Sequence, residues 1–301
     1  MRWPICTLTS LLLACTAVWT ARSQKLNSIT VDVDLTLVNA TVSDPHNRRV
    51  SGLNAQNFQI WEDKVEQHIE YFSGEELPVT LGIILDVSGS MEGQISTARN
   101  AVVTFLKNGN PEDQYFLIEF NNKISLVQDF TTDITKLQDR ITFTRTKGMT
   151  PMYDATYMGL EKLRELKSPK KAVLLITDGE DNHSRYNAAD IMGYLKEQDV
   201  QIFGIGITSE FGHRQAGHSK IEELTDFSGG RAFFPNSVYD LEDICTKIAG
   251  ELRNQYVLGY RSTNRNKDGN WRKIRVKVNP PEGSSHLTIH AKAGYYASQR
   301  Q

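Results

Sequence analysis

Continuous apolar runs, separated by segments with helical spacing, are the feature that most constrains the fold of this chain. "VTLGIILD", "KKAVLLITD" and "VQIFGIGI" each hold several apolar residues in a row and then stop at polar or glycine-containing stretches. Runs of this kind are typical of strands that are buried on both faces, and the segments between them repeat apolar residues at helical spacing. The pattern predicts an α/β domain with a doubly wound, mostly parallel sheet, which we place at residues 77–254.

The two flanks of this domain, residues 24–76 and 255–301, have the patterns of β-strands instead. "SITVDVDLTLVNATV" alternates apolar and polar side chains, and "YVLGY", "WRKIRVKV" and "HLTIHAKAGYYA" follow the α/β domain. The residues of the first segment that we expect on its buried face are Ile29, Val31, Val33, Leu35 and Leu37. Neither flank has enough strands to bury a core alone, so we expect the two to pair into one β-sandwich.

Residues 1–23 have the pattern of a secretory signal peptide. An early arginine, an apolar stretch from Ile5 to Trp19 and small residues before a cleavage position after Ser23 occur in that order. The stretch is shorter than the roughly 20 residues that a membrane helix requires, so we expect an exported protein, secreted or periplasmic, without a membrane span. A buried helix is one alternative. Lipid attachment at Cys15 is another, because "LLAC" loosely resembles a bacterial lipobox.

Composition excludes some classes of partner. The chain has 301 residues, 39% hydrophobic and 23% charged, and a net charge of −2 that becomes −4 without Arg2 and Arg22 of the leader. This charge does not favour binding to nucleic acid or to an anionic membrane. Cys245 is the only cysteine beyond the leader, and its helical spacing with apolar neighbours predicts a buried core thiol.

Oxygen-bearing side chains follow the apolar runs where the strands are expected to end. Asp86, Ser88 and Ser90 follow one run, Asp178 follows another, and Thr150 lies in the glycine-containing loop "KGMTP". In open parallel sheets, ligands bind outside the carboxyl ends of the strands. Two carboxylates and three hydroxyls suit Mg²⁺, Mn²⁺ or Ca²⁺, whereas Zn²⁺ prefers histidine or cysteine. We therefore predict a divalent cation site at this edge.

These residues resemble the metal-ion-dependent adhesion site (MIDAS) of the von Willebrand factor type A family. Asp86, Ser88 and Ser90 match its Asp-x-Ser-x-Ser motif, Thr150 matches its loop threonine and Asp178 matches its third-loop aspartate. The chain beyond the leader is also similar to secreted bacterial proteins with a related domain, which carry a β segment before the motif and a "YVLGY" segment after it.

The resemblance implies a non-enzymatic adhesion module. Ser88, Ser90 and sometimes Thr150 would coordinate Mg²⁺ directly, and the two aspartates would act largely through water. A position left to water would accept a glutamate or aspartate of a partner protein. Affinity would be gated by movement of the Thr150 loop, with displacement of the helix at 238–254, and Met149 departs from the second glycine that many members have there.

Three other interpretations remain open from the sequence. Asp86 and Ser88 could cap a helix that starts near Glu92, and Asp154 could cap the helix after Thr150. Asp86 could be the nucleophile of an Mg²⁺-dependent aspartyl-phosphate phosphotransferase, although Ser88 stands where such enzymes carry a general acid. The domain could also be a structural or assembly module whose metal site does not function.

Overall fold

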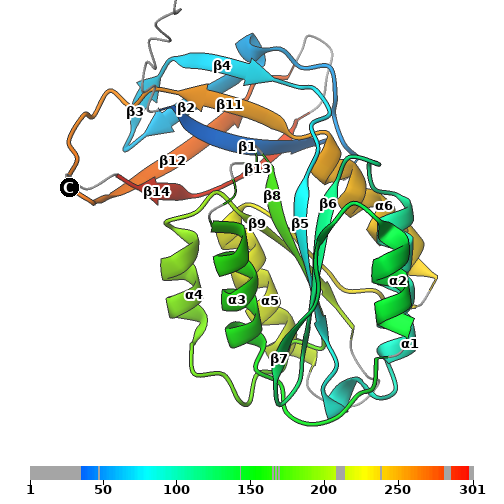
Figure 1. Cartoon of the computed structure of the whole chain (residues 1–301). Coiled ribbons are helices and arrows are strands. Elements are labelled where there is room, and N and C mark those ends of the chain that lie inside the picture. The colour runs from blue at the N-terminus through cyan, green and yellow to red at the C-terminus, as the bar shows by residue number, and fades with distance from the viewer. Residues whose placement is uncertain are drawn as a thin grey trace, which may run out of the picture. The chain divides into compact units, whose positions relative to one another are not determined.

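The computed structural model of the chain describes residues 35–46, 48–142, 144–164, 166, 168, 170–207, 214–237, 239–280 and 286–297 (Figure 1). The predicted signal peptide, Cys15 and the positions Ile29 to Val33 lie outside these residues. Among the described residues, no helix combines the length and the apolar character that a membrane crossing requires.

A six-stranded sheet forms the centre of the α/β unit, in the order β10-β9-β8-β5-β6-β7. Its strands are β5 (Thr80–Asp86), β6 (Gln114–Phe120), β7 (Ile124–Thr131), β8 (Lys171–Thr177), β9 (Gln201–Gly206) and β10 (Ala232–Phe233). All neighbours are parallel except β6 and β7. Every residue of β5 and β9 is buried, as the apolar runs predict for strands covered on both faces.

Helices cover both faces of this sheet (Figure 1). One face packs against α1 (Ile95–Lys107), α2 (Ile134–Thr142) and α6 (Asp240–Arg253), and the other packs against α3 (Met152–Arg164), α4 (Ala188–Leu195) and α5 (Arg214–Ser228). The prediction for Cys245 is confirmed, because its thiol is fully buried and contacts the carbonyl oxygen of Ala101 at 3.2 Å.

The two flanks pair with each other in two four-stranded sheets, β13-β1-β11-β4 and β14-β12-β2-β3. The strands are β1 (Thr36–Ser43), β2 (Phe58–Glu62), β3 (Val65–Gln67), β4 (Ile69–Ser73), β11 (Tyr256–Tyr260), β12 (Trp271–Val278), β13 (Thr288–Ala291) and β14 (Gly294–Tyr296). Both sheets contain strands from both flanks and share one apolar core. The predicted fold class, a doubly wound α/β unit between two β flanks, is therefore confirmed.

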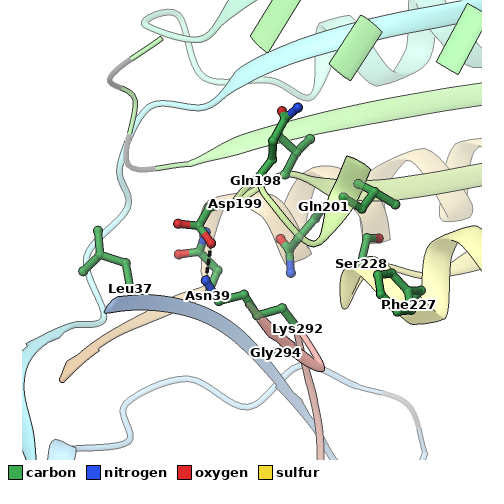
Figure 2. A pocket seen from close by; sticks show the side chains of 11 residues that line it. Leu37, Asn39, Gln198, Asp199, Gln201, Phe227, Ser228, Lys292 and Gly294 are labelled. Atoms are coloured by element: carbon green, nitrogen blue, oxygen red, sulfur yellow. Dashed lines mark hydrogen bonds and ion pairs between the residues drawn. The ribbon is translucent and has the colours of Figure 1, made fainter. Parts of the chain in front are cut away.

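The prediction for the buried face of the first segment is wrong at Leu37, the one of its five residues that lies in β1. Val38, Ala40 and Val42 enter the core between the two sheets, whereas Leu37 is only partly buried. Leu37 and Asn39 lie on the opposite face of β1, where they line a small pocket with residues of the α/β unit such as Gln198 (Figure 2). Because both faces of this strand are covered, apolar side chains occur on both, and simple alternation does not identify the core face.

The α/β unit joins the β-sheets at one end of its strands. β4 leads into β5, two residues separate the end of α6 from the start of β11, and Ser73 of β4 pairs with Val257 of β11. Lys292 forms an ion pair with Asp199 at the same junction (Figure 2). The opposite end of the sheet, where β5, β6 and β8 finish, is called the carboxyl edge below.

Candidate metal site at the carboxyl edge

Asp86, the last residue of β5, is a fully buried carboxylate. Its Oδ1 accepts a hydrogen bond from the backbone N–H of Ser88 at 2.9 Å, and its Oδ2 accepts one from the Thr177 hydroxyl at 2.6 Å. Burial raises the pKa of Asp86 to about 7, and the charge of nearby Asp178 acts in the same direction. A carboxylate in this position is stabilised by any positive charge that reaches the edge.

Two hydroxyls lie side by side just beyond this carboxylate. Ser88 is fully buried, Ser90 is exposed, and their Oγ atoms are 3.0 Å apart. A short 3-10 turn, Gly89–Met91, places them there by bending the chain directly after Ser88. The motif therefore presents one inner and one outer hydroxyl at the end of the central strand.

The loop before α3 is bonded to the same motif through its backbone. Lys147 N–H donates to the carbonyl of Val87 at 2.9 Å, and Gly89 N–H donates to the carbonyl of Gly148 at 3.0 Å. Gly148 has φ +91, a left-handed conformation that favours glycine. These bonds bring the buried Thr150 to the loop that carries the two serines.

Two asparagines hold the Thr150 loop from other sides. Thr150 N–H donates to Asn182 Oδ1 at 2.9 Å, and Asn182 N–H donates back to the carbonyl of Thr150 at 3.2 Å. Met149 N–H donates to Asn122 Oδ1 at 2.7 Å. The loops that follow β5, β6 and β8 are thus joined around Thr150.

Asp178 follows β8 on a backbone that is packed tightly against α5. A Cβ atom on Gly179, where φ is +81, would lie 2.4 Å from the carbonyl oxygen of Gly217, and a Cβ on Gly217 would lie 2.5 Å from the carbonyl of Asp178. Only glycine fits this backbone-to-backbone contact. Asp178 Oδ1 accepts the N–H of Glu180 at 3.1 Å, which fixes the carboxylate at the edge.

The arrangement contradicts the helix-capping interpretation of these residues. Helix α1 begins at Ile95, not near Glu92, and its N-cap residue is Gln94. Asp154 does not cap its own helix either, because its Oδ1 accepts the N–H groups of Arg185 at 2.9 Å and of Tyr186 at 3.0 Å. Asp86 therefore accepts hydrogen bonds from Ser88 and Thr177, and Asp154 accepts them from the loop before α4, and neither caps the helix that follows it.

The five predicted site residues lie on three adjoining loops, and the donor set fits a hard divalent cation. Asp86, Ser88 and Ser90 contact one another in series, Asp178 acts on Asp86 through its charge, and Thr150 is attached through Gly148 and Gly89. Within the described part of the chain, no three His, Cys, Asp or Glu side chains gather as a metal-binding group. A cation here would depend on hydroxyls and water as well as on carboxylates, as Mg²⁺ and Ca²⁺ commonly do.

Sequence reasoning missed three residues that shape the site. Thr177 donates to Asp86, and Asn122 and Asn182 hold the Thr150 loop. Thr177 could have been predicted from the sequence, since it is the last residue of the apolar run before Asp178. No local pattern indicates the two asparagines, because the residues that they bind lie 27 and 32 positions away along the chain.

Comparisons with known proteins find sequences that are similar to this chain. The family model of the von Willebrand factor type A domain matches residues 81–180. Inter alpha-trypsin inhibitor heavy chain 4 of Mus musculus is 28% identical over 217 residues, which cover 64% of this chain and 22% of that protein. Its Homo sapiens counterpart is 26% identical, with 64% and 23% covered. The chain thus spans less than a quarter of the length of these curated relatives.

Solved structures are similar at low sequence identity. A von Willebrand factor type A protein from Catenulispora acidiphila is 10% identical, covers 87% of this chain and 74% of its own, and has a TM-score of 0.49. The vWF domain of the type V pili tip protein Mfa5 from Porphyromonas gingivalis is 13% identical, with 59% and 97% covered and a TM-score of 0.46.

Proposed function

Because the chain carries a von Willebrand factor type A domain, we propose that it is a binding module that holds a divalent cation and captures an acidic side chain of a partner protein. The cation would be Mg²⁺, with Mn²⁺ or Ca²⁺ as chemically similar alternatives. The observation that carries the proposal is the fully buried Asp86 carboxylate, with the hydroxyls of Ser88 and Ser90 beside it at the carboxyl edge.

The site residues divide into two roles in this proposal. Asp86 and Asp178 supply the negative charge that retains the cation, and Ser88, Ser90 and Thr150 supply neutral oxygens. Neutral hydroxyls leave the charge of a cation poorly compensated. Mg²⁺, when bound, would supply a coordination position that an aspartate or glutamate of a partner can fill.

The contacts of Asp86 favour binding over phosphoryl transfer. Both of its oxygens already accept hydrogen bonds, from Ser88 N–H and from the Thr177 hydroxyl, and the side chain is fully buried. A nucleophile needs an oxygen that a substrate can reach. We therefore propose a non-enzymatic module, and the signal-peptide pattern of residues 1–23 supports an exported location, secreted or periplasmic.

Thermal melting with Mg²⁺ and with a chelator tests the cation site. We expect Mg²⁺ to raise the melting temperature of the wild type, because a ligand at about 100 times its dissociation constant stabilises by about 2.7 kcal/mol. Asp86→Asn keeps the shape of the side chain and removes its charge. This variant should melt at the same temperature with Mg²⁺ and with chelator, and without cation at pH 8 it should be at least as stable as the wild type.

Asp113→Asn is the matched control. Asp113 is also buried and accepts hydrogen bonds from Val79 N–H at 2.8 Å and Tyr115 OH at 3.1 Å, but it lies at the opposite end of the sheet. Its substitution should lower stability equally in both buffers and leave the Mg²⁺ shift unchanged. A wild type whose melting does not respond to Mg²⁺ would refute the cation site and favour a structural or assembly module with a non-functional site.

A further inference from the structure

The loop that carries Thr150 also presents exposed positive charge beside the proposed site. Arg145 and Lys147 are exposed, and Lys123 is exposed in the turn between β6 and β7. Among the described residues, none of these three side chains forms an ion pair. We call these three residues the basic strip.

Backbone contacts fix the basic strip against the site. Lys147 N–H is bonded to the carbonyl of Val87, the residue between Asp86 and Ser88. Asn122, which precedes Lys123, accepts the N–H of Met149. The basic strip therefore lies on the Thr150 side of the carboxyl edge. Lys147 is its residue that is bonded to the segment of Asp86, Ser88 and Ser90.

The segment that carries Arg145 and Lys147 is also hydrogen-bonded to neighbouring elements at Thr144. Arg99 of α1 donates through Nη2 to the carbonyl of Thr144, and the Thr144 hydroxyl donates to Glu119 at the end of β6. Thr144 is buried whereas Arg145 is exposed. A partner that meets these side chains would not have to order the loop first, which lowers the entropic cost of binding.

An apolar side chain lies within the basic strip. Met149 is 49% exposed even though it is large and hydrophobic, and it precedes the proposed ligand Thr150. Of the acidic side chains outside the five site residues, Glu92 follows β5 and Glu180 and Asp181 follow β8. Glu119 lies on the side of the basic strip, but its carboxylate already accepts the Thr144 hydroxyl. The edge is thus chemically asymmetric, with positive charge and an apolar contact on the Thr150 side.

We infer that the partner presents an acidic segment in which the captured carboxylate is flanked by further aspartates or glutamates and by an apolar residue. This inference rests on the proposed function and states which kind of protein segment the site would select. The flanking acids would face the basic strip, and the apolar side chain would cover Met149. Complementary charge of this kind governs association rate and partner choice more than total affinity.

Fluorescence anisotropy with two labelled peptides tests the inference on the full chain. The acidic probe is Gly-Asp-Glu-Leu-Glu-Asp-Gly, and the single-glutamate probe, Gly-Asn-Gln-Leu-Glu-Asn-Gly, keeps one of its four acidic residues. In Mg²⁺ at low salt we expect the acidic probe to bind about tenfold more tightly, since each exposed ion pair contributes modestly. The triple variant Lys123→Gln, Arg145→Gln, Lys147→Gln should bind both probes as the wild type binds the single-glutamate probe.

A matched control variant and the chelator distinguish failure of this inference from failure of the proposed cation site. Lys273→Gln with Arg275→Gln removes two exposed cations from β12 in the β-sheets and should leave the tenfold preference intact. Equal binding of both probes by the wild type, or binding of neither by a protein that Mg²⁺ stabilises, overturns the inference but not the cation site. An affinity for the acidic probe that is the same in Mg²⁺ and in chelator supports the basic strip and refutes the role of the cation.

Discussion

Lys170 places a positive charge in the interior of the protein, close to the start of β8. Its side chain is 1% exposed, and its Nζ donates to the carbonyl of Arg253 at the end of α6 at 2.7 Å. Burial lowers the pKa of Lys170 to about 8, although the carboxylates of Glu76 and Asp113 oppose this shift. The ammonium thus completes the carboxyl end of a helix, where a cation is favourable, at a cost in desolvation.

This cost predicts a pH dependence of stability with a definite sign. Between pH 8 and 10.5 the unfolded chain retains a proton on Lys170 that the folded protein has released, so the free energy of unfolding rises with pH in that window. Relative to Lys170→Met, the wild type should gain about 2 kcal/mol between pH 7 and pH 10. Urea unfolding of both proteins measures this difference, and parallel pH profiles would contradict it.

The three loops at the carboxyl edge act as one element because the loop that carries Thr150 is hydrogen-bonded to each of the other two. Asp181 Oδ2 accepts the N–H of Tyr153 at 3.0 Å, so the loop after β8 also caps the first turn of α3. Asn182 holds Thr150 within the same loop through two hydrogen bonds. Such contacts orient residues that would bind a metal, although they would not touch it.

Asn182→Ala should therefore weaken Mg²⁺ binding more than it weakens folding. We expect about a tenfold loss of Mg²⁺ affinity, which is typical when a residue that orients a ligand is removed. The melting temperature in chelator should change little, because the backbone bond from Asn182 N–H to Thr150 remains. Calorimetric titration with Mg²⁺ gives the affinity, and His183→Ala, an exposed neighbour, should behave as wild type.

Local patterns in the sequence predicted the elements, but not the contacts between them. The apolar runs predicted β5, β8 and β9 because burial on both faces favours apolar side chains at nearly every position between the strand ends. The motif spacing predicted Asp86, Ser88 and Ser90 because all three belong to one short segment. The alternation before Val38 suggested the wrong face of β1, since the α/β unit covers the face that would otherwise meet solvent.

At the scale of the whole molecule, a buried carboxylate connects the two β flanks. Glu62 of β2 accepts hydrogen bonds through Oε2 from Tyr260 OH at 2.8 Å and Tyr295 OH at 2.9 Å, and through Oε1 from Ser262 Oγ at 2.5 Å. Tyr260 belongs to β11, Ser262 follows it, and Tyr295 belongs to β14. All three come after the α/β unit in the sequence, whereas Glu62 comes before it. One side chain of the first flank thus satisfies three hydroxyls of the second.

Glu62→Ala should destabilise the protein by about 2–4 kcal/mol. The substitution leaves buried hydroxyls without their acceptor and opens a space between the sheets. Glu66→Ala, on the exposed strand β3, should change stability by less than about 0.5 kcal/mol. Urea unfolding followed by circular dichroism compares the two, and equal effects would show that the Glu62 contacts do not stabilise the paired flanks.

The adjacency of β4 and β11 determines how the molecule would carry a mechanical load. The chain enters and leaves the α/β unit through these hydrogen-bonded neighbours, at the end opposite the carboxyl edge. A pull between that edge and the β-sheets would run lengthwise along β5, which is paired with β6 on one side and with β8 on the other. Extracting β5 would require both ladders to shear at once, so tension would be resisted by many hydrogen bonds in parallel and not by one bond after another.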